Sequence, residues 1–399
     1  MNTNPAHHTA QLPIYFDASL EEKDRSLEAL KQLCQQETHL SDYPLAAGVE
    51  KNILLFDGAE LAAVIEDPTQ QAAIKTDMTR CLRDGPGVFV IKSAYTDTSV
   101  IDASTELFKQ IVADEKAAGQ GKGDHFGSNE RIWNSLQKVC LRSPADFIDY
   151  YSNPFLALAC EAWLGPYYQI TAQMNNVKPQ GAAQSAHRDY HLGFQSRATI
   201  AQFPAHSQVM SQFLTLQGAI AHADTPLLSG PTLFLPFSQQ LAAGYLFFRE
   251  DAYNHYFKEN YVQLPLNKGD MVFFSPALFH GAGTNQSTDD RIANLVQISS
   301  AFGRPMESID RYAMIEAVYP ELQARLAANT LSATQLRHAI AAVADGYSFP
   351  TNLDSDPPVG GNAPETAQQM MHRALRQGAS LQELQTELAA YAERRLAYR

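Results

Sequence analysis

The spacing of apolar and polar positions divides the chain into helical ends and a strand-rich middle. Apolar side chains recur at helical intervals among charged residues from Leu20 to Gln36. The same pattern predicts helices over residues 67–83, 98–118 and 155–164. We therefore predict that residues 1–85 form a helical N-terminal extension.

The middle of the chain, from about Tyr167 to Phe302, is predicted to form strands. Gly, Pro and Asn or Asp clusters separate short apolar runs, which are YQITAQMNNV, TIAQF, SQFLTLQGAIAHA, PTLFLPF, YVQLPL, DMVFFSPALFH and RIANLVQISSAF. This spacing predicts an all-β sandwich or barrel core and not βαβ units. We place this domain at residues 86–302, followed by a helical C-terminal extension over residues 303–399. A loop near residues 350–364 is expected to be flexible, as a linker or a lid.

Composition narrows the classes of function. The 399 residues include 30 Lys and Arg against 43 Asp and Glu, which gives a formal net charge of -13. This balance argues against a surface that neutralises phosphates, so nucleic acid is not an expected partner. No window approaches the ~20 apolar residues of a membrane span. The polar start MNTNPAHHTAQ has no apolar signal core, so we expect a cytoplasmic protein without a membrane partner. Nothing in the composition indicates an oligomeric state.

The stretch AHRDYH places His187 and Asp189 on alternate positions. In an extended segment, residues i and i+2 point to the same face, so both side chains could reach one metal ion. A lone His-x-Asp is more often a polar strand end, and a metal site needs a further ligand. His222 and Asp224 form a second His-x-Asp, and the pattern alone does not choose between the two pairs.

The further ligand is predicted to be His280, which lies where an apolar strand opens into a glycine-rich turn. Two histidines and one carboxylate that leave coordination positions open are typical of non-haem Fe(II) oxygenases. Arg291 lies 11 residues after His280, at the start of RIANLVQIS. If the side chains of this strand point alternately to its two faces, Arg291 faces inward and needs a carboxylate partner. The guanidinium of an arginine can bind a carboxylate with two hydrogen bonds. The other interpretation is that Arg291 faces solvent.

The segments HRDYH, SGPTLFLPFS and KGDMVFFSPALFHGAGTNQSTDDR resemble the phytanoyl-CoA dioxygenase (PhyH-like) family of Fe(II)/2-oxoglutarate oxygenases, over about residues 133–302. The resemblance implies a double-stranded β-helix, the jelly-roll and cupin-like form of a β core, with flanking helices. It implies that Fe(II) is held by His187, Asp189 and His280, and that Arg291 holds the C5 carboxylate of 2-oxoglutarate. Lys138 lies close to a family lysine that contacts this cosubstrate. His222 would then be structural or pocket-lining.

The expected activity is that of a dioxygenase that decarboxylates 2-oxoglutarate to succinate and CO2, consumes dioxygen and hydroxylates a small-molecule metabolite. Two alternatives remain: a non-redox cupin-like metalloenzyme, and a catalytically degenerate binding protein. Ala282 replaces a serine that can touch the cosubstrate, and Arg188 replaces a familiar glutamine, so phytanoyl-CoA is not the expected substrate. Arg188 and Arg197 near the ligands would suit an anionic metabolite, but solvation at the surface explains each arginine equally well. Residues 125–138 form a candidate substrate segment.

Overall fold

A mixed sheet of eight strands runs through the centre of the molecule. The computed structural model describes residues 12–119, 129–360 and 363–397. The strand order in the large sheet is β1-β2-β3-β8-β6-β10-β5-β4. Its strands are β1 (Gly48–Glu50), β2 (Ile53–Asp57), β3 (Val88–Lys92), β4 (Glu130–Ile132), β5 (Gln169–Val177), β6 (Thr215–Ala221), β8 (Met271–Phe274) and β10 (Arg291–Ser299). A second sheet pairs β7 (Leu233–Phe234) with β9 (His280–Gly281).

The strands from β5 onward pair as in a double-stranded β-helix. β10 lies between β5 and β6, β6 pairs with β8, and all three pairs are antiparallel. The opposite layer contains β7, β9 and isolated bridges such as His187–His280 and Phe234–Val262. The predicted jelly-roll order is therefore confirmed, although the barrel is not closed. The opposite layer is short because prolines in PTLFLPF and YVQLPL remove donors from the strand ladder.

The N-terminal region differs from the predicted helical extension. β1 and β2 continue the large sheet beyond β3. β2 and β3 are parallel, and the chain between them forms α2 (Gly58–Val64) and α3 (Pro68–Arg83). This is a βαβ unit, which the sequence analysis did not expect. The apolar run ILLFD of β2 is too short for periodicity to separate a strand from a helix.

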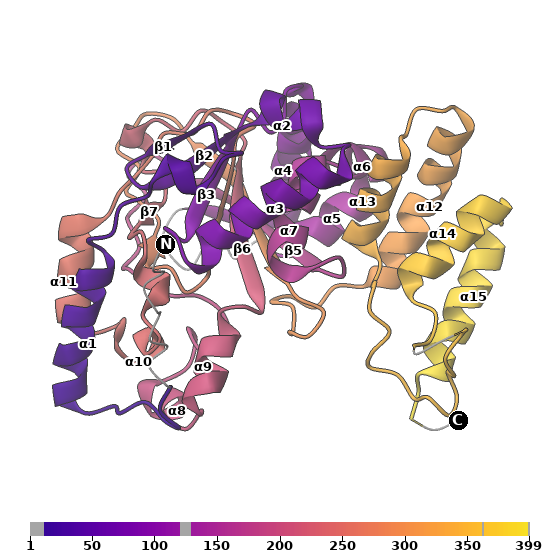
Figure 1. The fold of residues 1–399 in the computed structure, drawn as a ribbon. Coiled ribbons are helices and arrows are strands. Elements are labelled where there is room, and N and C mark those ends of the chain that lie inside the picture. The colour runs from indigo at the N-terminus through magenta and orange to yellow at the C-terminus, as the bar shows by residue number, and fades with distance from the viewer. Residues whose placement is uncertain (1–11, 120–128, 361–362, 398–399) are drawn as a thin grey trace.

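Helices cover the outer face of the large sheet, between the sheet and the C-terminal helices (Figure 1). This layer contains α3, α4 (Ser99–Ala117), α5 (Ser135–Arg142), α6 (Pro144–Tyr151) and α7 (Pro154–Leu164). Even-numbered positions of β5, β6 and β10, such as Ile170, Ile220 and Val296, pack into the same apolar core as these helices. By the alternation of a strand, the odd-numbered positions face the other way, toward the jelly-roll interior.

The remaining helices lie at the two ends of the molecule. The C-terminal helices are α12 (Arg311–Ala327), α13 (Ala333–Val343), α14 (Ala367–Gln377) and α15 (Leu381–Arg394). At the opposite end, α1 (Leu20–Leu33) lies beside α11 (Asp251–Asn260), where the Tyr253 hydroxyl donates to the Lys23 carbonyl at 3.0 Å (Figure 1). Short helices complete the fold: α8 (Arg197–Ile200), α9 (Ala205–Ser211), α10 (Gly244–Phe247), η1 (Leu40–Asp42), η2 (Leu227–Ser229) and η3 (Ser238–Gln240). No described helix is long and apolar enough to cross a membrane.

Two local expectations differ from the structure. TIAQF, predicted as a strand, overlaps α8, because the Ser196 hydroxyl caps this helix by accepting from the Thr199 amide at 3.1 Å. The described part of the loop near residues 350–364 is tied to α15. Asp356, 5% exposed, accepts a hydrogen bond from Arg394 Nε at 3.2 Å. None of residues 350–360 lines the cavity described below, and a lid role for this loop stays a prediction.

Candidate metal and cosubstrate site

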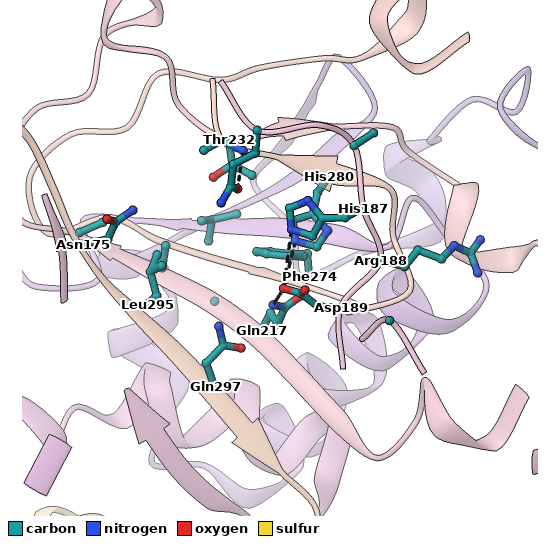
Figure 2. Close-up of a pocket in the computed structure, with 18 of the residues that line it drawn as sticks. Asn175, His187, Arg188, Asp189, Gln217, Thr232, Phe274, His280, Leu295 and Gln297 are labelled. Atoms are coloured by element: carbon teal, nitrogen blue, oxygen red, sulfur yellow. Dashed lines mark hydrogen bonds and ion pairs between the residues drawn. The ribbon is translucent and has the colours of Figure 1, made fainter. Parts of the chain in front are cut away.

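A cavity of about 840 Å³ lies on the inner face of the large sheet (Figure 2). Alternate positions of the central strands supply its wall, as the period of two in a strand requires. These wall residues are Gln173 and Asn175 of β5, Gln217, Ala219 and Ala221 of β6, Val272 and Phe274 of β8, and Arg291, Ala293, Leu295 and Gln297 of β10. His187, Asp189 and His280 border the same cavity from the opposite layer.

His187, Asp189 and His280 meet at one point of this cavity, as predicted. Asp189 Oδ2 lies 3.8 Å from His187 Nε2 and 3.6 Å from His280 Nε2. One potential ligand atom from each residue lies within 4.8 Å of the others. Backbone pairing sets this arrangement, because the amide of His187 donates to the carbonyl of His280 at 2.9 Å and the amide of His280 donates to the carbonyl of His187 at 3.1 Å.

Each imidazole is oriented by a backbone carbonyl. His187 Nδ1 lies 2.9 Å from the carbonyl oxygen of Ser185, and His280 Nδ1 lies 2.8 Å from that of Leu278. A carbonyl only accepts, so each Nδ1 carries the hydrogen and donates it. The lone pair of each Nε2 is therefore free and directed toward Asp189, as a metal ligand requires.

The charges of the three side chains also suit a divalent cation. Burial lowers the pKa of His187, and the neighbouring His280 lowers it further, so the neutral imidazole is favoured. Burial alone would raise the pKa of Asp189, but the two imidazoles beside it and the hydrogen bond from Gln217 hold it below its usual range. Two imidazoles and one carboxylate form a donor set that fits Fe(II) and leaves coordination positions open.

Arg291 faces the cavity and not the solvent. Its side chain begins β10 and shares the inner face with Ala293 and Leu295, and the residue is 8% exposed. Its NH1 group donates to the carbonyls of Ser229 at 3.0 Å and Gly283 at 3.3 Å. Within residues 12–119, 129–360 and 363–397, no acidic side chain forms an ion pair with it. Burial lowers its pKa to about 10, so the guanidinium stays charged at neutral pH.

Lys138 is not brought to this site. It lies on α5, where its ammonium group pairs with Glu115 of α4. Of the candidate substrate segment, residues 125–128 lie outside the described residues, whereas Arg131 and Trp133 line the cavity. The structure therefore places Trp133, but not Lys138, beside the proposed metal site.

The rival pair is not a metal site. His222 is buried on the outer side of the sheet, where Nδ1 lies 2.9 Å from Thr105 Oγ1 and Nε2 lies 2.8 Å from the Tyr150 hydroxyl. The Thr105 hydroxyl donates to the Ile101 carbonyl, so it accepts from Nδ1, and Tyr150 donates to Nε2. Both ring nitrogens are occupied. Asp224 accepts instead from the Lys268 amide at 2.9 Å.

The two arginines that suggested an anionic substrate have other roles. Figure 2 shows Arg188 directed away from the ligands on either side of it. Its guanidinium donates to the carbonyls of Leu241, at 3.1 Å, and Ser238, and lies 4.9 Å from the ring centre of Phe279. Arg197 pairs with Glu250 at 3.0 Å and does not line the cavity. Arg188 and Arg197 therefore do not support the expectation of an anionic substrate, which was based on them.

The sequence analysis missed the carboxamides of the cavity wall. Gln217 Nε2 donates to Asp189 Oδ2 at 2.6 Å. Gln297 accepts a hydrogen bond from the Tyr190 hydroxyl, and Gln173 accepts one from Arg131 at 3.2 Å. Each glutamine lies at an odd-numbered position of a strand whose even-numbered positions are mainly apolar. That alternation was visible in the sequence and could have identified the wall.

This chain is similar to one protein family and to several solved structures. A family model described as Phytanoyl-CoA dioxygenase (PhyH) matches residues 63–293, more than half of the chain. A search of curated proteins found no match. Similar solved structures include the non-heme alpha ketoglutarate dependent epimerase SnoN from nogalamycin biosynthesis, at 15% identity and a TM-score of 0.41, covering 59% of this chain and 85% of SnoN. AviO1 from Streptomyces viridochromogenes Tue57 has 16% identity and a TM-score of 0.40, covering 57% and 95%.

Proposed function

The chain belongs to the phytanoyl-CoA dioxygenase family, and we propose that it is an Fe(II)- and 2-oxoglutarate-dependent dioxygenase that hydroxylates a small-molecule metabolite. One observation carries this proposal. The three potential ligands and a buried arginine without an acidic partner in the described chain share one cavity. A metal site alone would not require that arginine.

In this proposal His187 and His280 hold iron through Nε2 and Asp189 holds it through a carboxylate oxygen. When bound, iron and 2-oxoglutarate supply the oxidising chemistry: 2-oxoglutarate loses CO2 to become succinate, one atom of dioxygen enters that succinate, and the other enters a substrate C–H bond. The chain positions the reactants and excludes water from the cavity.

Arg291 would bind the C5 carboxylate of 2-oxoglutarate. The carbonyls of Ser229 and Gly283 hold one end of its guanidinium, so the group is oriented before any ligand arrives. A planar guanidinium can donate two parallel hydrogen bonds to a carboxylate, and burial strengthens that attraction.

The substrate is proposed to be a small polar metabolite. Around the metal site the wall offers carboxamides, such as those of Gln173, Asn175 and Gln297, together with the aromatic rings of Trp133 and Phe248. Carboxamides both donate and accept hydrogen bonds, so they suit hydroxyl, carbonyl or amide groups. Rings of this kind pack against apolar carbon atoms of a ligand.

Cosubstrate binding and turnover test the proposal together. Calorimetry without oxygen should show that 2-oxoglutarate binds the Fe(II)-loaded protein, and addition of oxygen should release succinate. The matched control is Asp189→Ala, which should remove both signals because one ligand is lost. A wild-type protein that binds iron but neither binds 2-oxoglutarate nor forms succinate would instead support a non-redox metalloenzyme. A protein that binds neither would support a degenerate binding protein.

A further inference from the structure

We propose that Gln217 is a positioning residue that holds the Asp189 carboxylate ready for a divalent metal. The inference rests on the proposed function, since it concerns the same three ligands. Gln217 lies in the middle of β6, is 3% exposed and lines the cavity directly beside Asp189 (Figure 2). It contacts a ligand and not the metal, so its role is to fix the geometry of that ligand.

The orientation of the Gln217 amide follows from its partner. Its Nε2 lies 2.6 Å from Asp189 Oδ2. An ionised carboxylate has no hydrogen to donate, so the nitrogen of the amide, and not its oxygen, must face Asp189. The oxygen Oε1 is consequently turned away from the carboxylate. It is buried and has no hydrogen-bond partner in the described part of the chain.

This bond restrains the oxygen that the histidines face. Asp189 Oδ2 is 3.8 Å from His187 Nε2 and 3.6 Å from His280 Nε2, and it is also the acceptor for Gln217. The amide hydrogen occupies one lone pair of Oδ2 and opposes rotation of the carboxylate plane. A restrained carboxylate is disposed to bind through one oxygen, which keeps other coordination positions open for 2-oxoglutarate and dioxygen.

The strand that carries Gln217 is a rigid support. β6 lies between β8 and β10, and Gln217 is in register with Phe274 on one side and Gln297 on the other. Gln297 receives its own hydrogen bond from Tyr190, whereas the side chain of Gln217 bonds only Asp189 among the described residues. A buried amide with one polar atom unsatisfied contributes little to folding, which favours a role at the metal site.

Cobalt binding by the full-length apoprotein tests this role, with Co(II) as the probe. In Gln217→Met the side chain keeps its length but loses the N–H group. Removal of a hydrogen-bond partner of a metal ligand typically weakens metal affinity by about 10–100-fold, and we expect a loss in that range. The visible absorption of bound Co(II) should also change, because a released carboxylate can chelate with both oxygens and alter the coordination number.

The matched control is Gln173→Met, the same substitution in the same cavity at a residue that does not contact Asp189. It should leave the cobalt affinity and spectrum unchanged. If Gln217→Met does not fold, as judged by circular dichroism, Gln217→Asn replaces it, since its amide is one methylene too short to reach Asp189. A folded Gln217 variant with wild-type affinity and spectrum would overturn the inference. Failure of the wild-type protein to bind cobalt, or normal binding by Asp189→Ala, would instead reject the metal site itself.

Discussion

Replacing Arg291 by alanine should separate cosubstrate binding from metal binding. Arg291 is 8% exposed and forms no ion pair with a described acidic side chain, so a bound carboxylate would be its only charged partner there. Removal of one member of a buried charged pair typically costs about 2–5 kcal/mol. A tenfold change in a dissociation constant corresponds to about 1.4 kcal/mol. The dissociation constant of 2-oxoglutarate should therefore increase by a factor between roughly 30 and several thousand.

The assay is anaerobic calorimetry of 2-oxoglutarate binding to the Fe(II)-loaded protein. Affinity for Fe(II), measured separately, should not change, because Arg291 is not a ligand. Arg291→Lys should recover only part of the loss, since a compact ammonium group cannot form the two parallel hydrogen bonds of a guanidinium. The pKa of Arg291, lowered by burial to about 10, keeps the wild-type side chain charged throughout a measurement at neutral pH.

A second arginine substitution controls for general damage. Arg197→Ala removes an arginine that pairs with Glu250 outside the cavity, and it should leave 2-oxoglutarate binding unaltered. Normal 2-oxoglutarate binding by Arg291→Ala would refute the reasoning, move the anchor elsewhere and make Lys138 the next residue to test. A wild-type protein that binds Fe(II) but never binds 2-oxoglutarate would refute the oxygenase proposal as a whole.

Three further predictions concern the residues around the site. Asp189→Ala should abolish Fe(II) binding in equilibrium dialysis while His222→Gln should not, and the reverse result would make the second His-x-Asp the ligand pair. Burial lowers the pKa of His222 from 6.5 to about 3, so the unfolded chain takes up the proton first. Wild-type stability should therefore fall below pH 6.5 by about 1.4 kcal/mol per pH unit relative to His222→Gln, and parallel urea-unfolding curves would contradict this. A Cβ at Gly244 would lie 2.0 Å from Arg188 Cζ. Gly244→Ala should thus destabilise the fold by about 1–3 kcal/mol, less in an Arg188→Gln background, and equal losses in both backgrounds would argue against this clash.

The proposed metal ligands could be predicted in two steps, because alternation offered two His-x-Asp pairs and the family resemblance chose between them. His187 and Asp189 are two residues apart in an extended segment, so their side chains share a face wherever that segment lies. His280 follows an apolar strand and precedes a glycine-rich turn, which marks the rim of a barrel. The same alternation favoured the inner face for Arg291 but left a solvent-facing side chain open. These inferences needed no knowledge of which strands pair.

The N-terminal strands and the roles of the two other arginines could not be predicted, because they depend on distant parts of the chain. β2 becomes a strand by pairing with β3, more than thirty residues later, and its five residues carry no decisive period. Arg188 lies between two ligands in the sequence, which suggested a role in substrate binding. Alternation turns it to the opposite face, where the carbonyls of Ser238 and Leu241 receive its hydrogen bonds.

Polar residues lie on the cavity-facing side of the large sheet, where a simple hydrophobic core would have apolar side chains. β6 is buried on both faces, so a polar side chain there costs free energy unless it finds a partner. Gln217 bonds Asp189, Gln297 bonds Tyr190, and Arg291 bonds only two carbonyls within the described part of the chain. Polar partners are therefore more complete beside Asp189 than at Arg291. A chain selected only for folding would place apolar residues at these positions, so their unsatisfied groups indicate where ligands complete the hydrogen bonding.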